Sequence, residues 1–207
     1  NRRIDSISNI QEFFKNSILQ MTFESVLSCL SKHHANPIAC SYLIRIVRHM
    51  IYHKWFIKEI ISEDFITKIL IPACYIQADD LQNYEEIPEN FIAFHYPFED
   101  QNPDLISTRI TVAELLKVIG KHFDQCINMI LECCASNSLE TSDEQLRYID
   151  LESRLYIISC VLEFRPDETS IYEFLNKVIS TDDQPLFLVS VAVFALQYME
   201  INKEYLN

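Results

Sequence analysis

The chain has 207 residues, of which 49% are hydrophobic, and its formal net charge at pH 7 is −13. This length and apolar content suffice for one continuous core. The sequence pI near 4.8 argues against a nucleic-acid-binding protein, because phosphate backbones require a basic surface. Only one glycine is present where average usage of about 7% would give roughly fourteen, which argues against glycine-rich phosphate-binding loops.

Apolar residues recur at steps of three and four along nearly the whole chain, which predicts amphipathic helices. In chain order the pattern predicts helices at about 5–19, 22–34, 38–60, 64–77, 105–122, 124–136, 145–163, 168–180 and 184–200. Asn36-Pro37 marks one boundary between helices and Arg165-Pro166 another. The predicted fold class is therefore all-α.

The second helices of successive pairs are spaced like repeats. Their central apolar residues give four approximate reference positions, Ile44, Leu115, Leu155 and Val193. The separations are 71, 40 and 38 residues, and leaving out a 26-residue acidic insertion at about 79–104 reduces the first to 45. HEAT and armadillo repeats have about 40–47 residues. We therefore expect 1–207 to be a single α-solenoid of antiparallel helix pairs, an internal piece of a longer chain; an unrelated helical bundle is the alternative.

The acidic insertion carries eight carboxylates and no lysine or arginine. These residues are Asp79, Asp80, Glu85, Glu86, Glu89, Glu99, Asp100 and Asp104. Such a density of charge predicts a segment that is solvated or bound to a positive partner. We interpret the eight carboxylates as a candidate partner-binding site, with a role in solubility alone as the alternative.

A basic cluster surrounds the only tryptophan, Trp55. Its members are Arg45, Arg48, His49, His53, Lys54 and Lys58. The cluster could bind an acidic partner or the chain's own acidic insertion. The favoured interpretation is the solvated side of an amphipathic helix.

Two histidines of this cluster, His49 and His53, lie four residues apart and could share a helical face with a metal ion. Zinc needs a third and usually a fourth ligand, and the adjacent His33-His34 pair has no recognised ligand spacing. We therefore expect no metal site and no cofactor.

Seven cysteines, odd in number and mostly at apolar helical positions, predict small hydrophobic side chains in a reducing compartment. Cys133 and Cys134 are consecutive, and a thiol nucleophile would need a base such as His122. We expect no catalytic residue. The longest apolar run, 186–196, is too short to span a bilayer and predicts a helix buried on most sides.

Three stretches carry a family resemblance: Ile69-Leu70-Ile71-Pro72, then Asp79-Asp80-Leu81-x-x-Tyr84-Glu85-Glu86-x-Pro88-Glu89-x-Phe91-Ile92, then Thr108-Arg109 entering an apolar helix. They resemble the central region of importin-β superfamily karyopherins, most closely the branch of the importin-α re-exporter CAS and the large importins. The stretch 150–161 resembles the family's following second helix. Ile87 departs from the pattern, since an acidic residue often stands there.

The resemblance implies a nuclear transport receptor that shuttles between cytoplasm and nucleus. Such a receptor binds protein cargo and the GTP form of Ran on its inner face, and FG-repeat nucleoporins between its outer helices, without a chemical step. In relatives an acidic insertion contacts Ran or cargo, and we carry that role to the eight carboxylates. The alternatives are another HEAT scaffold or adaptor, or an all-α hydrolase with a closed pocket around His122 or Cys126.

Overall fold

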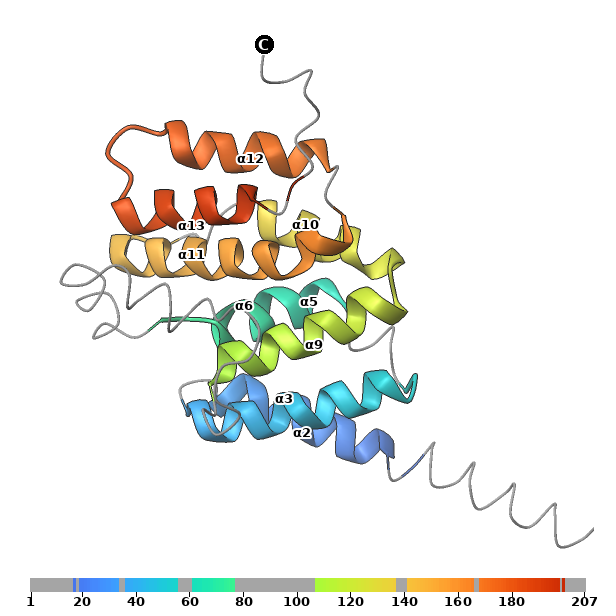
Figure 1. The fold of residues 1–207 in the computed structure, drawn as a ribbon. Coiled ribbons are helices and arrows are strands. Elements are labelled where there is room, and N and C mark those ends of the chain that lie inside the picture. The colour runs from blue at the N-terminus through green and yellow to red at the C-terminus, as the bar shows by residue number, and fades with distance from the viewer. Residues whose placement is uncertain are drawn as a thin grey trace, which may run out of the picture.

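The computed structural model describes residues 17, 19–33, 36–55, 61–76, 107–136, 141–165, 168–197 and 199. Within these ranges the chain is helical and contains no strand, which confirms the predicted all-α class (Figure 1). The elements are α2 (Gln20–His33), α3 (Pro37–Tyr52), α5 (Glu63–Phe65), the π-helix η2 (Ile66–Leu70), α6 (Ile71–Ala73), α9 (Thr108–His122), α10 (Gln125–Ala135), α11 (Glu144–Val161), the 3₁₀ turn η3 (Leu162–Phe164), α12 (Thr169–Ser180) and α13 (Leu186–Leu196). The predicted helix at 5–19 and the acidic insertion lie outside the described residues, apart from positions 17 and 19.

Polar side chains begin three of these helices. The Asn36 side chain accepts a hydrogen bond from the Ala39 amide at 3.0 Å, and Pro37 occupies the first helical position of α3. The Asp143 carboxylate accepts from the Leu146 amide at 3.1 Å at the start of α11, and Ser62 acts likewise before α5. The boundary predicted at Asn36-Pro37 is therefore confirmed.

Helix α3 is shorter than predicted: a helix was expected at 38–60, and α3 ends at Tyr52. Lys54 adopts a left-handed conformation with φ 60°, and its amide donates to the Ile51 carbonyl at 2.8 Å. The Trp55 amide donates to the Met50 carbonyl at 2.9 Å, which completes a Schellman motif. Glycine usually occupies the left-handed position of this motif, so a lysine there leaves no stop signal in the sequence.

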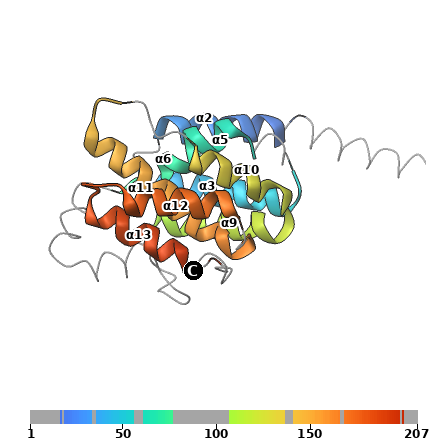
Figure 2. The same cartoon turned by 90° about the horizontal axis from the view of Figure 1, so that it is seen from above.

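The helices form two layers. In one layer α3 packs on α9, α9 on α11 and α11 on α13. In the other, α2 contacts η2, α10 contacts α5 and η2, and α12 contacts α10. Figure 1 shows the pairs following one another from α2 and α3 at one end to α12 and α13 at the other, and Figure 2 looks along this direction.

Helix α11 is the most enclosed element, since α6, α9, α10 and α13 all contact it. Every residue from 152 to 159 is buried, including four polar or charged ones. Helix α13 buries Leu188 and Ala192 on one side, but Leu186 is 69% and Val193 53% exposed. The prediction that α13 is buried on most sides is confirmed, since within α13 only Leu186 and Val193 are exposed. No helix among the described residues has the length and hydropathy that a membrane span needs.

Candidate functional site

The eight carboxylates of the candidate partner-binding site all lie outside the described residues. The structure instead shows how the chain is held on either side of the segment 77–106. Cys74 and Tyr75 precede this segment, and Thr108 and Arg109 follow it. The candidate site is the base of this segment, which we define as the described residues that hold the chain on either side of it.

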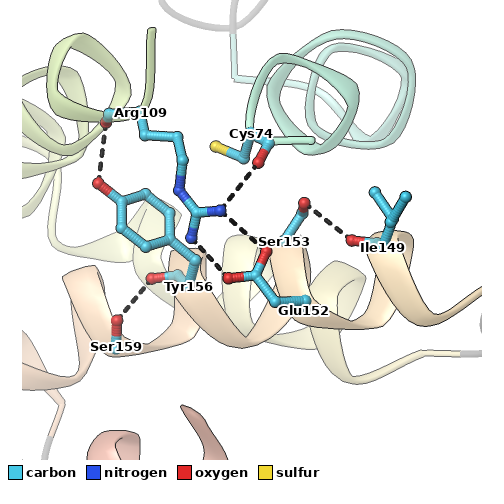
Figure 3. A network of polar contacts seen from close by, with 7 residues as sticks. All are labelled: Cys74, Arg109, Ile149, Glu152, Ser153, Tyr156 and Ser159. Carbon is cyan, nitrogen blue, oxygen red and sulfur yellow. Dashed lines mark hydrogen bonds and ion pairs between the residues drawn. The ribbon is translucent and has the colours of Figure 1, made fainter. Parts of the chain in front are cut away.

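Arg109, the second residue of α9, lies at the centre of a buried polar network (Figure 3). Its Nη1 and Nη2 donate to the two carboxylate oxygens of Glu152 on α11, at 2.9 and 2.7 Å. Nη1 also donates to the Cys74 carbonyl at 3.2 Å. Arg109 is 4% and Glu152 0% exposed, so this is a bidentate ion pair shielded from water. It connects the chain before and after the segment 77–106 to the same helix.

Tyr156 fixes the orientation of Arg109. The guanidinium carbon lies 4.0 Å from the centroid of the Tyr156 ring, and the Tyr156 hydroxyl donates to the Arg109 carbonyl at 3.0 Å (Figure 3). Burial raises the pKa of Tyr156 well above its ordinary value, so the hydroxyl keeps the proton that it donates. Stacking and hydrogen bonding together hold the guanidinium plane against α11.

A second buried pair on α11 binds Tyr75. Arg154 Nε donates to the Asp150 carboxylate at 2.6 Å, and Arg154 Nη1 donates to the Cys133 carbonyl at 2.8 Å. The Tyr75 hydroxyl donates to the other Asp150 oxygen at 2.9 Å. Burial, and then the Asp150 charge, raise the pKa of Tyr75 well above its ordinary value. Tyr75 therefore remains a neutral hydrogen-bond donor.

Thr108 attaches the other end of the segment to α3. Its hydroxyl donates to the Pro37 carbonyl at 3.0 Å and accepts from the Ser41 hydroxyl at 3.3 Å. Both sides of the segment 77–106 are thus held by buried or partly buried hydrogen bonds to α3 and α11.

The charges at this base cancel. The buried charged residues of the described chain are Arg109, Asp150, Glu152 and Arg154, two of each sign. Each arginine is already paired with a carboxylate of α11. The base therefore supplies no net positive charge to compensate the eight carboxylates of the insertion.

The described residues of the basic cluster around Trp55 are exposed or half-buried, unlike the buried ion pairs at the base of the segment 77–106. The imidazole of His53 stacks on the Trp55 ring with centroids 5.0 Å apart, and both His49 and His53 are exposed. Arg48 forms an ion pair with Glu114 of α9. Lys58 lies outside the described residues, as do the side chains of His33 and His34. Among the residues described, no three or more histidine, cysteine, aspartate or glutamate side chains gather as metal ligands would.

The candidate thiols lie in environments that suppress ionisation. Cys134 is 0% and Cys133 9% exposed, and burial raises the pKa of both thiols. Burial also raises the pKa of Cys126, which is half-buried. A thiol nucleophile needs the opposite shift. His122 is exposed and its ring meets Tyr52 edge-on at 6.0 Å.

The buried cysteines predict a loss of stability at alkaline pH. Burial raises the pKa of Cys40 and Cys160 to about 11, whereas an unfolded thiol has a pKa of about 8.5. Between these values the unfolded chain releases protons that the folded chain retains, so the free energy of unfolding falls as pH rises. Urea unfolding under reducing conditions, followed by circular dichroism at pH about 7.5 and about 10, measures this decline. It should be shallower in Cys160→Ala; an unchanged pH dependence in that variant would contradict a contribution from Cys160.

Sequence reasoning found Arg109 as part of a motif but missed its partners. Glu152, Tyr156 and Asp150 belong to the stretch 150–161, for which the sequence offers only a resemblance to the family's following second helix. The available signal was the presence of charged residues four apart, Asp150 and Arg154, within an apolar helical pattern.

Comparison of the chain with protein-family models, with curated proteins and with solved structures finds no significant match.

Proposed function

We propose that this chain is a protein-binding region of a nuclear transport receptor of the importin-β superfamily, most like the CAS and large-importin branch. In this proposal the helix pairs form a HEAT-type α-solenoid without enzymatic activity. GTP-bound Ran and protein cargo bind the layer of α3, α9, α11 and α13, and FG-repeat nucleoporins bind between helices of the other layer. The receptor shuttles between cytoplasm and nucleus.

The order of helix contacts supports the solenoid. A solenoid repeat contacts only its neighbours, and each second helix packs beside the second helix of the next pair. The succession α3, α9, α11, α13 has this order, with α2, the α5 to α6 segment, α10 and α12 on the other side. Another HEAT scaffold or adaptor would share this order, so it supports the architecture more than the partner.

The observation that carries the proposal is the attachment of the acidic insertion. Arg109 lies five residues after Asp104, the last carboxylate of the insertion, and joins the Cys74 carbonyl before the insertion to Glu152 of the next helix pair. Arg109 and Glu152 lie in stretches that resemble the karyopherin pattern, and Cys74 follows the stretch Ile69-Leu70-Ile71-Pro72. The buried base carries no net charge and so does not neutralise the insertion, which supports the proposal that the eight carboxylates attract a basic partner.

Binding of Ran tests the proposal directly. The 207-residue chain, immobilised, is exposed to Ran loaded with GTP or with GDP. We expect clear preference for the GTP form, because a transport receptor couples cargo binding to the nucleotide state of Ran. Equal binding of the two forms, or no binding of either, contradicts the assignment and favours a scaffold or adaptor.

The acidic insertion is expected to accelerate association with GTP-bound Ran. Changing Glu85, Glu86 and Glu89 together to Gln should lower the association rate by roughly three- to tenfold at low ionic strength, since clustered charge steers a basic partner. The effect should shrink as salt is added. Stopped-flow fluorescence measures the rate.

The matched control neutralises three exposed carboxylates elsewhere, with Glu132→Gln, Glu173→Gln and Asp182→Asn. It makes the same change in net charge, and its association rate should stay close to that of the parent chain. If both triple variants slow association equally, the insertion has no specific role. The free energy of unfolding should change by less than about 0.5 kcal/mol in both.

A further inference from the structure

A second surface of the molecule has the opposite charge. Helices α3 and α9 lie side by side (Figure 1), and each exposes side chains to solvent. We define this α3–α9 face by six side chains, Tyr42, Arg45, Ile46 and Tyr52 of α3 and Lys117 and Lys121 of α9. The ring contact between Tyr52 and His122 and the ion pair between Arg48 and Glu114 join the two helices along it.

Exposed large apolar side chains concentrate on α3, the helix that supplies the apolar part of the α3–α9 face. Tyr42 is 53%, Ile46 40% and Tyr52 60% exposed. With Ile38, they make up half of the eight large apolar side chains that are exposed among the described residues, although α3 has only 16 residues. Such a concentration on one helix is typical of an interaction surface, whereas scattered single residues are not.

The same face is cationic on a strongly acidic chain. Residues 37–55 contain Arg45, Arg48 and Lys54 and no aspartate or glutamate. Lys117 and Lys121 are exposed on α9, where the nearby acid Glu114 is paired with Arg48. The face therefore attracts negative charge in a molecule whose net charge is −13.

Tyrosine, arginine and aliphatic side chains together favour binding over simple solvation. Arg45 lies over the Tyr42 ring at 5.9 Å, so a cation and an aromatic ring are presented side by side. Tyrosine and arginine are the residue types that interfaces enrich, while a purely solvated helix face carries charge without exposed rings.

We infer that the α3–α9 face binds an acidic segment of a partner protein that carries aromatic or aliphatic side chains between its carboxylates. The carboxylates of this segment pair with Arg45, Lys117 and Lys121. Its apolar side chains cover Tyr42, Ile46 and Tyr52. This partner is opposite in charge to the one proposed for the acidic insertion, and the inference does not depend on binding of Ran.

Fluorescence anisotropy with a labelled synthetic peptide tests the inference. The probe has about 16 residues, with Glu interrupted by Leu or Phe at every third or fourth position so that both partner features are present. We expect it to bind the 207-residue chain with a Kd below about 100 μM at roughly 50 mM salt. The triple variant Arg45→Glu, Lys117→Glu, Lys121→Glu should raise the Kd at least about tenfold.

The matched control reverses three exposed lysines away from the face, with Lys32→Glu, Lys68→Glu and Lys177→Glu. This variant makes the same change in net charge, and its Kd should stay within about threefold of the parent. The double variant Tyr42→Ala, Ile46→Ser should raise the Kd of the peptide by about fivefold or more. It should leave the Kd of a Glu-only peptide nearly unchanged. Circular dichroism checks that each variant is folded.

Four results would overturn the inference. The first is a Kd of the peptide for the parent chain above about 1 mM. The second is an equal rise in Kd for the triple variant of the face and for the triple lysine control, because net charge alone would then explain the effect. The third is equal or tighter binding of a single-stranded DNA of the same length. The fourth is a large gain in affinity when Glu85, Glu86 and Glu89 become Gln, beyond that of the Glu132, Glu173 and Asp182 control, because the chain's own insertion would then be the occupant.

Discussion

Replacing Glu152 with Ala is expected to lower the free energy of unfolding by about 3–5 kcal/mol. The substitution leaves the Arg109 guanidinium buried without the carboxylate that accepts two of its hydrogen bonds. An uncompensated buried charge is far more costly than the loss of an exposed ion pair. Urea unfolding followed by circular dichroism at 222 nm measures the change.

Lys68→Ala is the matched control for this experiment. Lys68 and Asp64 form an ion pair at 2.8 Å, nearly the same length as the Arg109–Glu152 pair at 2.7 Å, but their side chains are 69% and 77% exposed. Its loss should change stability by at most about 0.5 kcal/mol. A loss below about 1 kcal/mol in Glu152→Ala would contradict a dry network, since it would require water to solvate Arg109.

The double variant Arg109→Met, Glu152→Leu separates charge burial from packing. Apolar side chains of similar volume can replace a buried ion pair with little or no loss of stability. We therefore expect the double variant to be more stable than Glu152→Ala, despite carrying one more substitution. If it is less stable, the hydrogen bond to the Cys74 carbonyl or the Tyr156 stacking contributes more than the ion pair.

Gly120→Ala is expected to destabilise the chain by about 1–3 kcal/mol, although alanine favours helices over glycine by about 1 kcal/mol. A Cβ atom at Gly120 would lie 2.7 Å from Phe164 Cγ, and closer still to Cδ2 and Cε2 of the same ring. Gly120 is buried in α9, and the ring of η3 occupies the space beside it. Urea unfolding under the conditions used for Glu152→Ala measures the loss.

In a Phe164→Ala background, the effect of Gly120→Ala on the free energy of unfolding should change sign. Phe164→Ala alone should destabilise the chain, because the ring packs against the core. In that background Gly120→Ala meets no ring, so the helix preference of alanine should make it neutral or stabilising by up to about 1 kcal/mol. Stabilisation by Gly120→Ala in the parent chain would contradict close packing and indicate that the ring moves aside readily.

Helical periodicity predicted every described helix, because apolar residues at steps of three and four are a local property of the sequence. The end of α3 was missed because the helix ends at a left-handed Lys54, and this conformation is unfavourable for lysine. The reason for the single glycine was also missed. Gly120 is required because the Phe164 ring packs against it. Phe164 lies 44 positions further along the chain, so no local sequence pattern predicts this contact.

The base of the candidate site was predictable only in part. Arg109 stood out because a family pattern places an arginine there, but its pairing with Glu152 depends on which helices become neighbours. Buried charges in α11 contradict simple amphipathic patterning, since Asp150, Glu152 and Arg154 lie in or beside the stretch 152–159, in which every residue is buried. Asp150 and Arg154 pair with each other, and their other partners are the Tyr75 hydroxyl, which follows α6, and the Cys133 carbonyl of α10. The partner of Glu152 is Arg109 of α9.

The enclosure of α11 has a consequence for how the chain opens. Amide hydrogens exchange with solvent when their helix separates from its neighbours, and α11 has neighbours in both layers. Its central amides should therefore exchange only when most of the array comes apart, whereas α2 and α12, at opposite ends, can detach while the rest persists. Deuterium uptake read by mass spectrometry would show a gradient of protection that is highest in the middle of the array and lowest at its ends.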